Sequence, residues 1–151
     1  KEKEEYSGMS TTIVLVAVLN DTIHVAHVGD SRAYLVLKDS IKQLTVDHSM
    51  VQELVKKGEI TTEEAKIHPK KNIITRSLGA QSNIEVDYVQ QNFPSDSAIL
   101  VCTDGLSNYI EKQGILEFFK NLEKEQLVEA LIDYANEMGG NDNITALVIA
   151  K

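Results

Sequence analysis

The sequence has 151 residues, 42% of them apolar, which suits one globular domain or most of a larger one. Its 15 Lys and Arg residues against 23 Asp and Glu residues give a formal net charge of −8, which argues against binding to nucleic acid or to an anionic membrane. A single cysteine, Cys102, excludes an internal disulfide, and no apolar run reaches about 18 residues, so we expect a cytoplasmic protein without a transmembrane helix.

Four strands are predicted in the first third of the chain, at residues 11–19, 22–28, 32–37 and 41–44. Asn20-Asp21 tolerates the left-handed backbone that a tight hairpin needs. Because the connections are short, we expect these strands to form an antiparallel meander. The apolar run in residues 11–19 is nearly continuous, which predicts that both faces of that strand are covered.

Two helices are predicted in an insertion that follows the meander. Ser49 and Thr61 are each followed three residues later by Gln or Glu, the spacing of a capping box. Gly58 ends the first helix, and Pro69 stops the second. We place this insertion at residues 48–78, within a single domain that spans residues 1–151.

Further strands are predicted at residues 84–90, 98–102 and 144–150, and a helix lies within residues 107–120. Another helix, which ends at Gly139-Gly140, carries a regular apolar stripe made by Leu127, Ala130, Leu131, Tyr134, Ala135 and Met138. Buried strands and one-faced helices together predict an α+β fold, with stacked sheets and helices outside. The glycine-rich motifs of nucleotide-binding sheets are absent from the sequence.

Acidic residues stand at the ends of three predicted strands. Asp104-Gly105 follows residues 98–102, Asp142 precedes residues 144–150, and Asp30 follows residues 22–28. Carboxylates held on rigid backbone at neighbouring strand ends can share one hard cation, and Mg²⁺ and Mn²⁺ prefer such oxygen ligands. A cation of this kind lowers the pKa of a bound water and clamps phosphoryl oxygens. The pattern therefore favours a metal site for phosphate chemistry.

Plainer interpretations exist for each candidate. Asp-Gly is a common turn dipeptide, so the three turns could belong to an ordinary acidic α/β domain. His24 and His27 are three residues apart in a strand and point to opposite faces, so they do not form a chelating pair. Ser31 and Ser107 lie beside candidate ligands, but the sequence has no G-x-S-x-G nucleophile elbow.

Six motifs in a fixed order resemble the metal-dependent serine/threonine protein phosphatases of the protein phosphatase 2C type, the PPM family, and most of all its short bacterial members. The motifs are Gly8-Met9-Ser10-Thr11-Thr12, Ala26-His27-Val28-Gly29-Asp30-Ser31-Arg32-Ala33-Tyr34, Leu44-Thr45-Val46-Asp47-His48-Ser49, Thr75-Arg76-Ser77-Leu78-Gly79, Thr103-Asp104-Gly105-Leu106-Ser107-Asn108 and Gly140-Asn141-Asp142-Asn143-Ile144-Thr145.

The resemblance implies a four-layer αββα fold, an antiparallel β-sandwich flanked by helices, in which residues 48–78 form a flap that influences substrate choice. It implies that Asp104 and Asp142 are ligands of paired Mn²⁺ or Mg²⁺ ions, and that Asp30 and Asp104 are ligands of a third, weaker ion. In this mechanism a metal-bridging water attacks the phosphorus of phosphoserine or phosphothreonine, without a phosphoenzyme and without a catalytic residue of this chain beyond the metal ligands. Phosphorylated proteins and a cognate serine/threonine kinase are the implied partners.

The family's opening segment has no counterpart in this sequence. That segment carries an arginine that binds substrate phosphate and an Asp-Gly whose acid bridges the two metals. A large β-sandwich domain commonly needs about 200–250 residues, so we expect a C-terminal portion of the phosphatase domain, incomplete at its N-terminus and inactive alone. The alternative is a non-catalytic regulatory or binding domain on the same fold.

Overall fold

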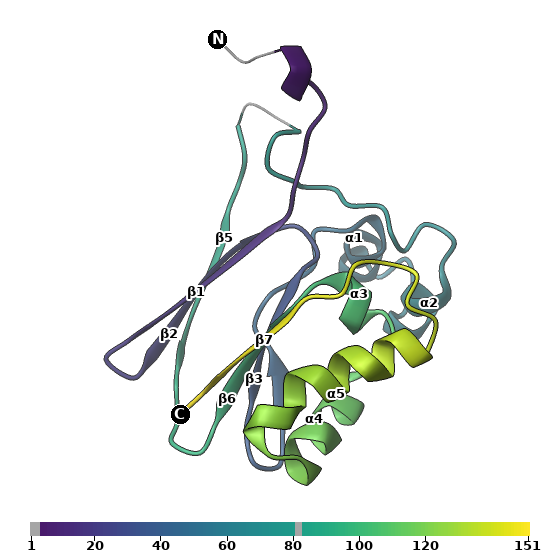
Figure 1. Ribbon diagram of the computed structural model, residues 1–151. Helices are drawn as coiled ribbons and strands as arrows, with labels where there is room; N and C mark the ends of the chain where they lie inside the picture. The colour runs from purple at the N-terminus through teal and green to yellow at the C-terminus, as the bar shows by residue number, and fades with distance from the viewer. Residues whose placement is uncertain (1–3, 81–82) are drawn as a thin grey trace.

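The computed structural model describes residues 4–80 and 83–151, which form two stacked antiparallel sheets with helices on one side (Figure 1). The first sheet has the order β1-β2-β5, with bounds Ile13–Leu19, Thr22–Val28 and Asp87–Asn92. The second has the order β4-β3-β6-β7, with bounds Ile41–Gln43, Arg32–Val36, Ala98–Cys102 and Ala146–Ala150. All the strand pairs are antiparallel, which confirms the predicted α+β class.

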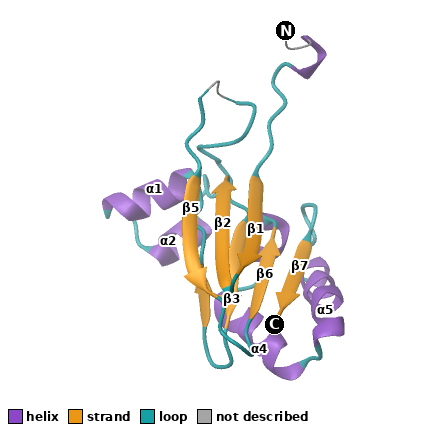
Figure 2. Cartoon of the chain, turned by 90° about the vertical axis from the view of Figure 1, so that its left-hand side faces the viewer, coloured by secondary structure: helices purple, strands orange, loops and turns teal. Residues whose placement is uncertain are grey.

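Among the described residues, helical segments lie at four places along the chain. A short 3₁₀ turn, Glu4–Tyr6, precedes the strands, and α1 (Met50–Lys57) and α2 (Thr62–Ile67) lie in the predicted insertion. Figures 1 and 2 show α4 (Lys112–Asn121) and α5 (Lys124–Glu137) beside the four-stranded sheet, where α5 contacts β7 and α4 contacts β4. The one-turn helix α3 (Asp104–Ser107) follows β6 directly. No helix in the described ranges is long and apolar enough to cross a membrane.

The central strands β3 and β6 are buried on both faces because their side chains alternate between two cores. Leu35 and Ile99 point into the core between the sheets, where they meet Ile23, Val25 and Phe93. Tyr34 and Leu100 point the other way and pack against the helices, in a core that also contains Leu106, Ile110, Ile115, Leu131 and Ala135. Both cores therefore depend on β6, the strand that ends at the first acidic turn.

The predicted meander is wrong in one respect. The β1–β2 hairpin forms as expected, with Asn20 and Asp21 at φ 48° and 59°. However, β2 and β3 do not pair, because the chain crosses from one sheet to the other at residues 29–31. Gly29, at φ 115°, makes this corner, and an added Cβ would lie 2.3 Å from Thr12 Cγ2. Asp30 therefore lies at a corner between sheets rather than in a hairpin bend.

The outer face of the first sheet is open within residues 4–80 and 83–151. Leu15 of β1 is 55% exposed and Tyr88 of β5 is 59% exposed, while Val14 and Val16 pack toward the inner core. The expectation that both faces of β1 are covered is thus not met in this chain. Of the four expected layers, the described residues form the two sheets and one helical layer.

The insertion leaves and rejoins the sandwich at one place. Ser49 pairs with Ile74 in an isolated bridge, and the N–H of Thr75 donates to the carbonyl oxygen of His48 at 2.8 Å. The capping box of Thr61 forms with both of its hydrogen bonds, and Gly58 ends α1 in the left-handed conformation, as predicted. Both ends of the insertion therefore converge beside the Gly29 corner.

Candidate metal centre

The two acidic turns lie side by side because β6 and β7 are neighbours. Cys102 pairs with Ala146, so the chain that leaves β6 meets the chain that enters β7. Thr103 connects them with three hydrogen bonds: its N–H donates to Thr145 O at 3.1 Å, its hydroxyl donates to Asn143 O at 3.2 Å, and its Oγ1 accepts from the N–H of Thr145 at 3.0 Å. The backbone and the hydroxyl of Thr103 thus fix the two turns to each other.

Gly105 allows this close approach. A Cβ added at Gly105 would lie 2.3 Å from the carbonyl oxygen of Asn143 and 2.9 Å from its carbonyl carbon. Both are backbone atoms that cannot rotate away, so a side chain here would separate the turns. The sequence predicted a glycine that permits a tight turn, whereas the structure shows a glycine that permits contact between two turns.

Asp104 and Asp142 are each held by local hydrogen bonds. Asp104 is the first residue of α3, and its Oδ2 accepts from Asn108 Nδ2 at 3.4 Å. Asp142 Oδ1 accepts from the N–H of Asn143 at 2.7 Å. In the same loop, the N–H of Asn141 donates to the hydroxyl of Tyr109 at 3.1 Å, which ties the second turn to the segment after α3. Both carboxylates therefore have restricted positions.

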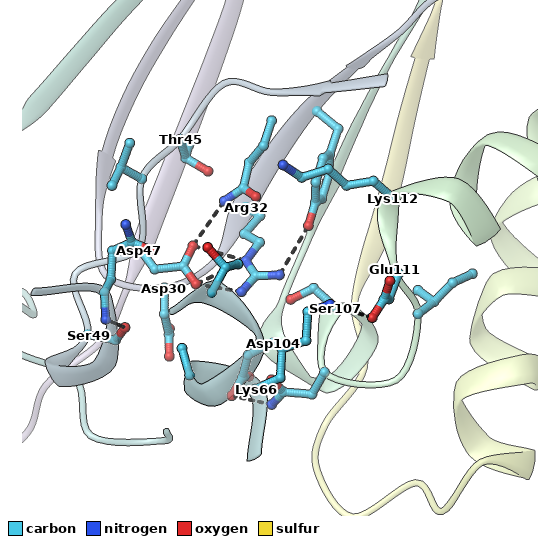
Figure 3. A pocket seen from close by; sticks show the side chains of 18 of the residues that line it. Asp30, Arg32, Thr45, Asp47, Ser49, Lys66, Asp104, Ser107, Glu111 and Lys112 are labelled. Carbon is cyan, nitrogen blue, oxygen red and sulfur yellow. Dashed lines mark hydrogen bonds and ion pairs between the residues drawn. The ribbon is translucent and has the colours of Figure 1, made fainter. Parts of the chain in front are cut away.

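Asp30 approaches Asp104 across a cavity of about 1110 Å³ that both residues line. Figure 3 shows them on the same side of the Arg32–Asp47 pair. The cavity continues between the helical insertion and the four-stranded sheet, along Val51 of α1 and Ile41 of β4. Asp142 is exposed and lies outside the lining of this cavity.

The three carboxylates interact through their negative charges, Asp142 with Asp104 and Asp104 with Asp30. Burial raises the pKa of Asp30 above the usual range of an aspartate, and the negative charge of Asp104 raises it further. Burial also raises the pKa of Asp104, and the charge of Asp142 adds to that increase. Like charges brought together in this way favour protonation or a bound cation. Oxygen-only ligands from short side chains fit Mg²⁺ or Mn²⁺ better than a soft metal.

A partly buried ion pair beside these acids was not found from the sequence. Arg32 donates from Nε to Asp47 Oδ1 at 2.9 Å and from Nη2 to Asp47 Oδ2 at 2.6 Å. Gln43 Nε2 also donates to Asp47, and Arg32 Nη1 donates to the hydroxyl of Tyr34. Burial opposes the charge of Arg32, but its bond to Asp47 raises the pKa of the guanidinium overall. Arg32 and Asp47 both occur in the quoted motifs, but no local sequence pattern indicates that they form an ion pair.

A second group of possible ligands consists of His27, His48 and Asp87, whose ligand atoms lie within 4.8 Å of one another. The N–H of Gly29 donates to His48 Nδ1 at 3.0 Å, so in the neutral ring the proton is on Nε2. That N–H faces Asp87 Oδ2 at 3.3 Å, which leaves no lone pair of His48 for a metal in this arrangement. We therefore interpret the group as a hydrogen-bonded network. His24 points away from it toward Tyr88, as the strand spacing predicts.

Neither serine beside the acids has the surroundings of a nucleophile. Ser31 Oγ pairs with Thr12 Oγ1 at 3.0 Å. Ser107 is buried and lines the cavity, and its Oγ has no hydrogen-bond partner among the described residues. An activated serine needs a general base within hydrogen-bonding reach, so this chemistry is not supported.

Known proteins resemble this chain over nearly all of its length. The family model for protein phosphatase 2C matches residues 1–54. The serine/threonine phosphatase stp of Listeria innocua is 39% identical over 97% of the chain, and protein phosphatase PhpP of Streptococcus pneumoniae is 39% identical over 99%. Among solved structures, the serine/threonine phosphatase Stp1 of Staphylococcus aureus superposes with a TM-score of 0.93 at 35% identity over 99% of the chain. The catalytic domain of PstP, solved with 2 manganese ions, superposes with a TM-score of 0.83 at 33% identity over 94% of the chain.

The chain spans only part of these proteins. It covers 59% of the Listeria protein, 61% of PhpP, and 59% of each of the two superposed chains. Within that span the antiparallel sheets with flanking helices agree with the fold class expected from the sequence. Over the part of their length that it spans, the chain is a homologue of the PPM-type bacterial serine/threonine phosphatases, and its residues 1–54 match the protein phosphatase 2C family model.

Proposed function

We propose that this chain forms part of a divalent-metal-dependent phosphatase that hydrolyses phosphoserine and phosphothreonine in proteins. The observation that carries the proposal is the backbone contact between Gly105 and Asn143, which brings Asp104 and Asp142 to one place at the ends of two paired strands. Two carboxylates on neighbouring turns offer the oxygen ligands that a hard cation prefers.

Asp104 has the central role in this proposal. It shares one cation site with Asp142 and a second with Asp30, because it is the acid whose charge raises the pKa of Asp30 and whose own pKa is raised by Asp142. Mn²⁺ or Mg²⁺ bound there would supply positive charge to phosphoryl oxygens and a water of lowered pKa. We propose two ions, with a third at Asp30, in the complete protein. The manganese in the PstP structure supports this choice of metal.

Hydrolysis needs a water oxygen to bond to phosphorus while the phosphorus–oxygen ester bond breaks, and the freed serine or threonine oxygen takes up a proton. In this chain the carboxylates would hold the cations whose positive charge the reaction needs, because positioning and electrostatics dominate phosphoryl transfer. Arg32 keeps its guanidinium on Asp47 through two short hydrogen bonds, so it is not free to bind the substrate phosphate. We propose that an arginine in another part of the complete protein performs that task.

The helical insertion at residues 48–78 is proposed to act as the flap that contacts the substrate protein. Its helices form one wall of the cavity that Asp30 and Asp104 line, with Val55 of α1 and Ala65 of α2 on that wall. The similarity to bacterial phosphatases also supports a cognate serine/threonine kinase and a cytoplasmic location. Copurification with the kinase and cell fractionation would test these two points.

The test is a Mn²⁺ titration of full-length protein, followed by binding and by hydrolysis of p-nitrophenyl phosphate. Asp104→Asn and Asp142→Asn should lower kcat/KM by about 100-fold or more, because each removes a charge from the site. Asp133→Asn, on the exposed side of α5, is the matched control and should change nothing. Residues 1–151 alone should show negligible turnover; robust activity would refute that part.

A non-catalytic binding domain is the alternative. It predicts that the full-length protein neither binds Mn²⁺ through Asp104 nor hydrolyses the ester. If both aspartate variants bind Mn²⁺ as the unmodified protein does, the metal-site proposal fails.

A further inference from the structure

We propose that His48 is a positioning residue that holds the Gly29–Asp30 corner in the conformation that presents Asp30 to the cation. The proposal rests on the proposed function in one respect, namely that Asp30 is a ligand. It concerns the segment between β2 and β3, where residues 29–31 belong to neither sheet and must be held in place by other contacts.

His48 binds Gly29 at both of its backbone polar groups. The backbone N–H of His48 donates to the carbonyl oxygen of Gly29 at 2.9 Å. The backbone N–H of Gly29 donates to His48 Nδ1 at 3.0 Å in a buried hydrogen bond. Because Gly29 has a φ of 115°, which side-chain-bearing residues rarely adopt, these two bonds fix an otherwise uncommon backbone conformation one residue before Asp30.

The imidazole ring of His48 is itself fixed from three sides. His27 stacks on it with ring centroids 4.7 Å apart and an interplanar angle of 18°, and His27 Nε2 bonds the carbonyl oxygen of Val46 at 2.9 Å. Asp87 Oδ2 of β5 lies 3.3 Å from Nε2, and Arg76 Nη1 lies 3.2 Å from the same Nε2 and donates to the other oxygen of Asp87 at 2.8 Å. His48 is 5% exposed, so water does not replace these partners.

This network selects one tautomer. Gly29 donates to Nδ1, which places the proton of the neutral ring on Nε2; Asp87 Oδ2, 3.3 Å away, can accept that proton, whereas the neighbouring Arg76 guanidinium cannot. Burial lowers the pKa of His48, which also favours the neutral ring. Two substitutions replace the two ring nitrogens of histidine separately. The side-chain oxygen of asparagine can take the position of Nδ1, whereas the side-chain oxygen of glutamine reaches the position of Nε2. His48→Asn therefore keeps the bond to Gly29, and His48→Gln removes it.

The experiment compares these two variants in the full-length protein. Amide hydrogen exchange measures the protection of the Gly29 N–H. A Mn²⁺ titration measures the affinity of the site at Asp30, which is identified as the site that is lost in the Asp30→Asn variant. We expect wild-type protection and affinity in His48→Asn. In His48→Gln we expect fast exchange at Gly29 and an affinity lower by about 10-fold or more, the usual effect of removing a residue that supports a metal ligand. His24→Asn, in the same sheet but hydrogen-bonded to Tyr88, is the control and should leave both readouts unchanged.

Four outcomes would count against either the role of His48 or the assumption that Asp30 is a ligand. Equal exchange and equal affinity in the asparagine and glutamine variants would overturn the role of His48. Fast exchange at Gly29 with unchanged affinity would overturn the presentation of Asp30, although the hydrogen bond exists. If Asp30→Asn binds Mn²⁺ with the full stoichiometry and affinity of the unmodified protein, Asp30 is not a ligand, and that part of the proposed function fails with it. A long-range ¹H–¹⁵N spectrum that shows the proton of neutral His48 on Nδ1 would refute the selected tautomer directly.

Discussion

Replacing Gly105 with alanine tests whether contact between the acidic turns creates the metal site. The new methyl carbon would lie 2.3 Å from the carbonyl oxygen of Asn143, whereas ordinary contact begins at 3.4 Å. The difference requires the two turns to move apart by about 1 Å. Because Thr103 bonds Asn143 and Thr145, the movement also strains the hydrogen bonds between the turns.

Two effects of different size follow from this displacement. Overpacking of this kind costs about 1–3 kcal/mol of folding free energy, which in a domain of this size lowers Tm by roughly 2–4 °C per kcal/mol. Functional groups must be held within about 0.5 Å of their productive positions, so separating Asp104 from Asp142 should lower Mn²⁺ affinity by about 10-fold or more. The loss of affinity should therefore exceed what partial unfolding explains.

Calorimetric Mn²⁺ titration and thermal unfolding in chelator measure the two effects in the full-length protein. Gly114→Ala, in α4, is the control, since its added Cβ would meet only the side chain of Ile110, at 3.0 Å, and no part of the acidic turns. That change affects folding through helix propensity and the contact with Ile110, and it should not alter Mn²⁺ affinity. If Gly105→Ala binds Mn²⁺ as tightly as the unmodified protein, the contact does not create the site.

Three further predictions concern the surroundings of the site. Asp30→Asn should stabilise the metal-free protein at neutral pH, because the pKa of Asp30 is raised in the folded state and its charged form therefore destabilises the fold. This gain in stability should shrink as the pH falls through the folded-state pKa and should vanish below the pKa of an unfolded aspartate. Urea unfolding in the presence of chelator measures it. Arg32→Met should cost about 3 kcal/mol in urea unfolding, since Asp47, 12% exposed, loses its cation, and adding Asp47→Leu should recover part of that loss. Residues 1–151 alone should self-associate through the exposed side chains of β1, and Leu15→Lys should reduce this in sedimentation velocity; a concentration-independent monomer without the substitution would contradict it.

The sequence predicted those features that depend on neighbouring residues. Asn20-Asp21 formed the hairpin turn, Thr61 formed its capping box and Gly58 ended α1, because each signal acts over a few residues. The apolar stripe of α5 is buried at Leu127, Leu131 and Ala135, although Met138 at its end is 55% exposed. The strand expected at residues 84–90 begins only at Asp87.

Features that depend on distant contacts were not predictable in the same way. The pairing of β2 with β5 joins residues sixty or more positions apart, and no local pattern specifies it. The Arg32–Asp47 pair and the stacking of His27 on His48 arise only when the corner at Gly29 directs β3 into the second sheet. Sequence alternation assigned His27 to the face opposite His24 but gave no sign of the partner that it meets there.

The candidate ligands were found from the sequence because their motifs combine chemistry with packing. Asp30 follows Gly29, whose missing Cβ makes room for Thr12, and Asp104 precedes Gly105, whose missing Cβ makes room for Asn143. In both cases the carboxylate stands next to a position where one backbone segment must lie against another. A glycine beside an aspartate at a strand end thus indicates a place where two segments converge and a charge is fixed between them. This explains why the aspartates of the Gly29-Asp30 and Asp104-Gly105 dipeptides, which follow strands of different sheets, both line one cavity.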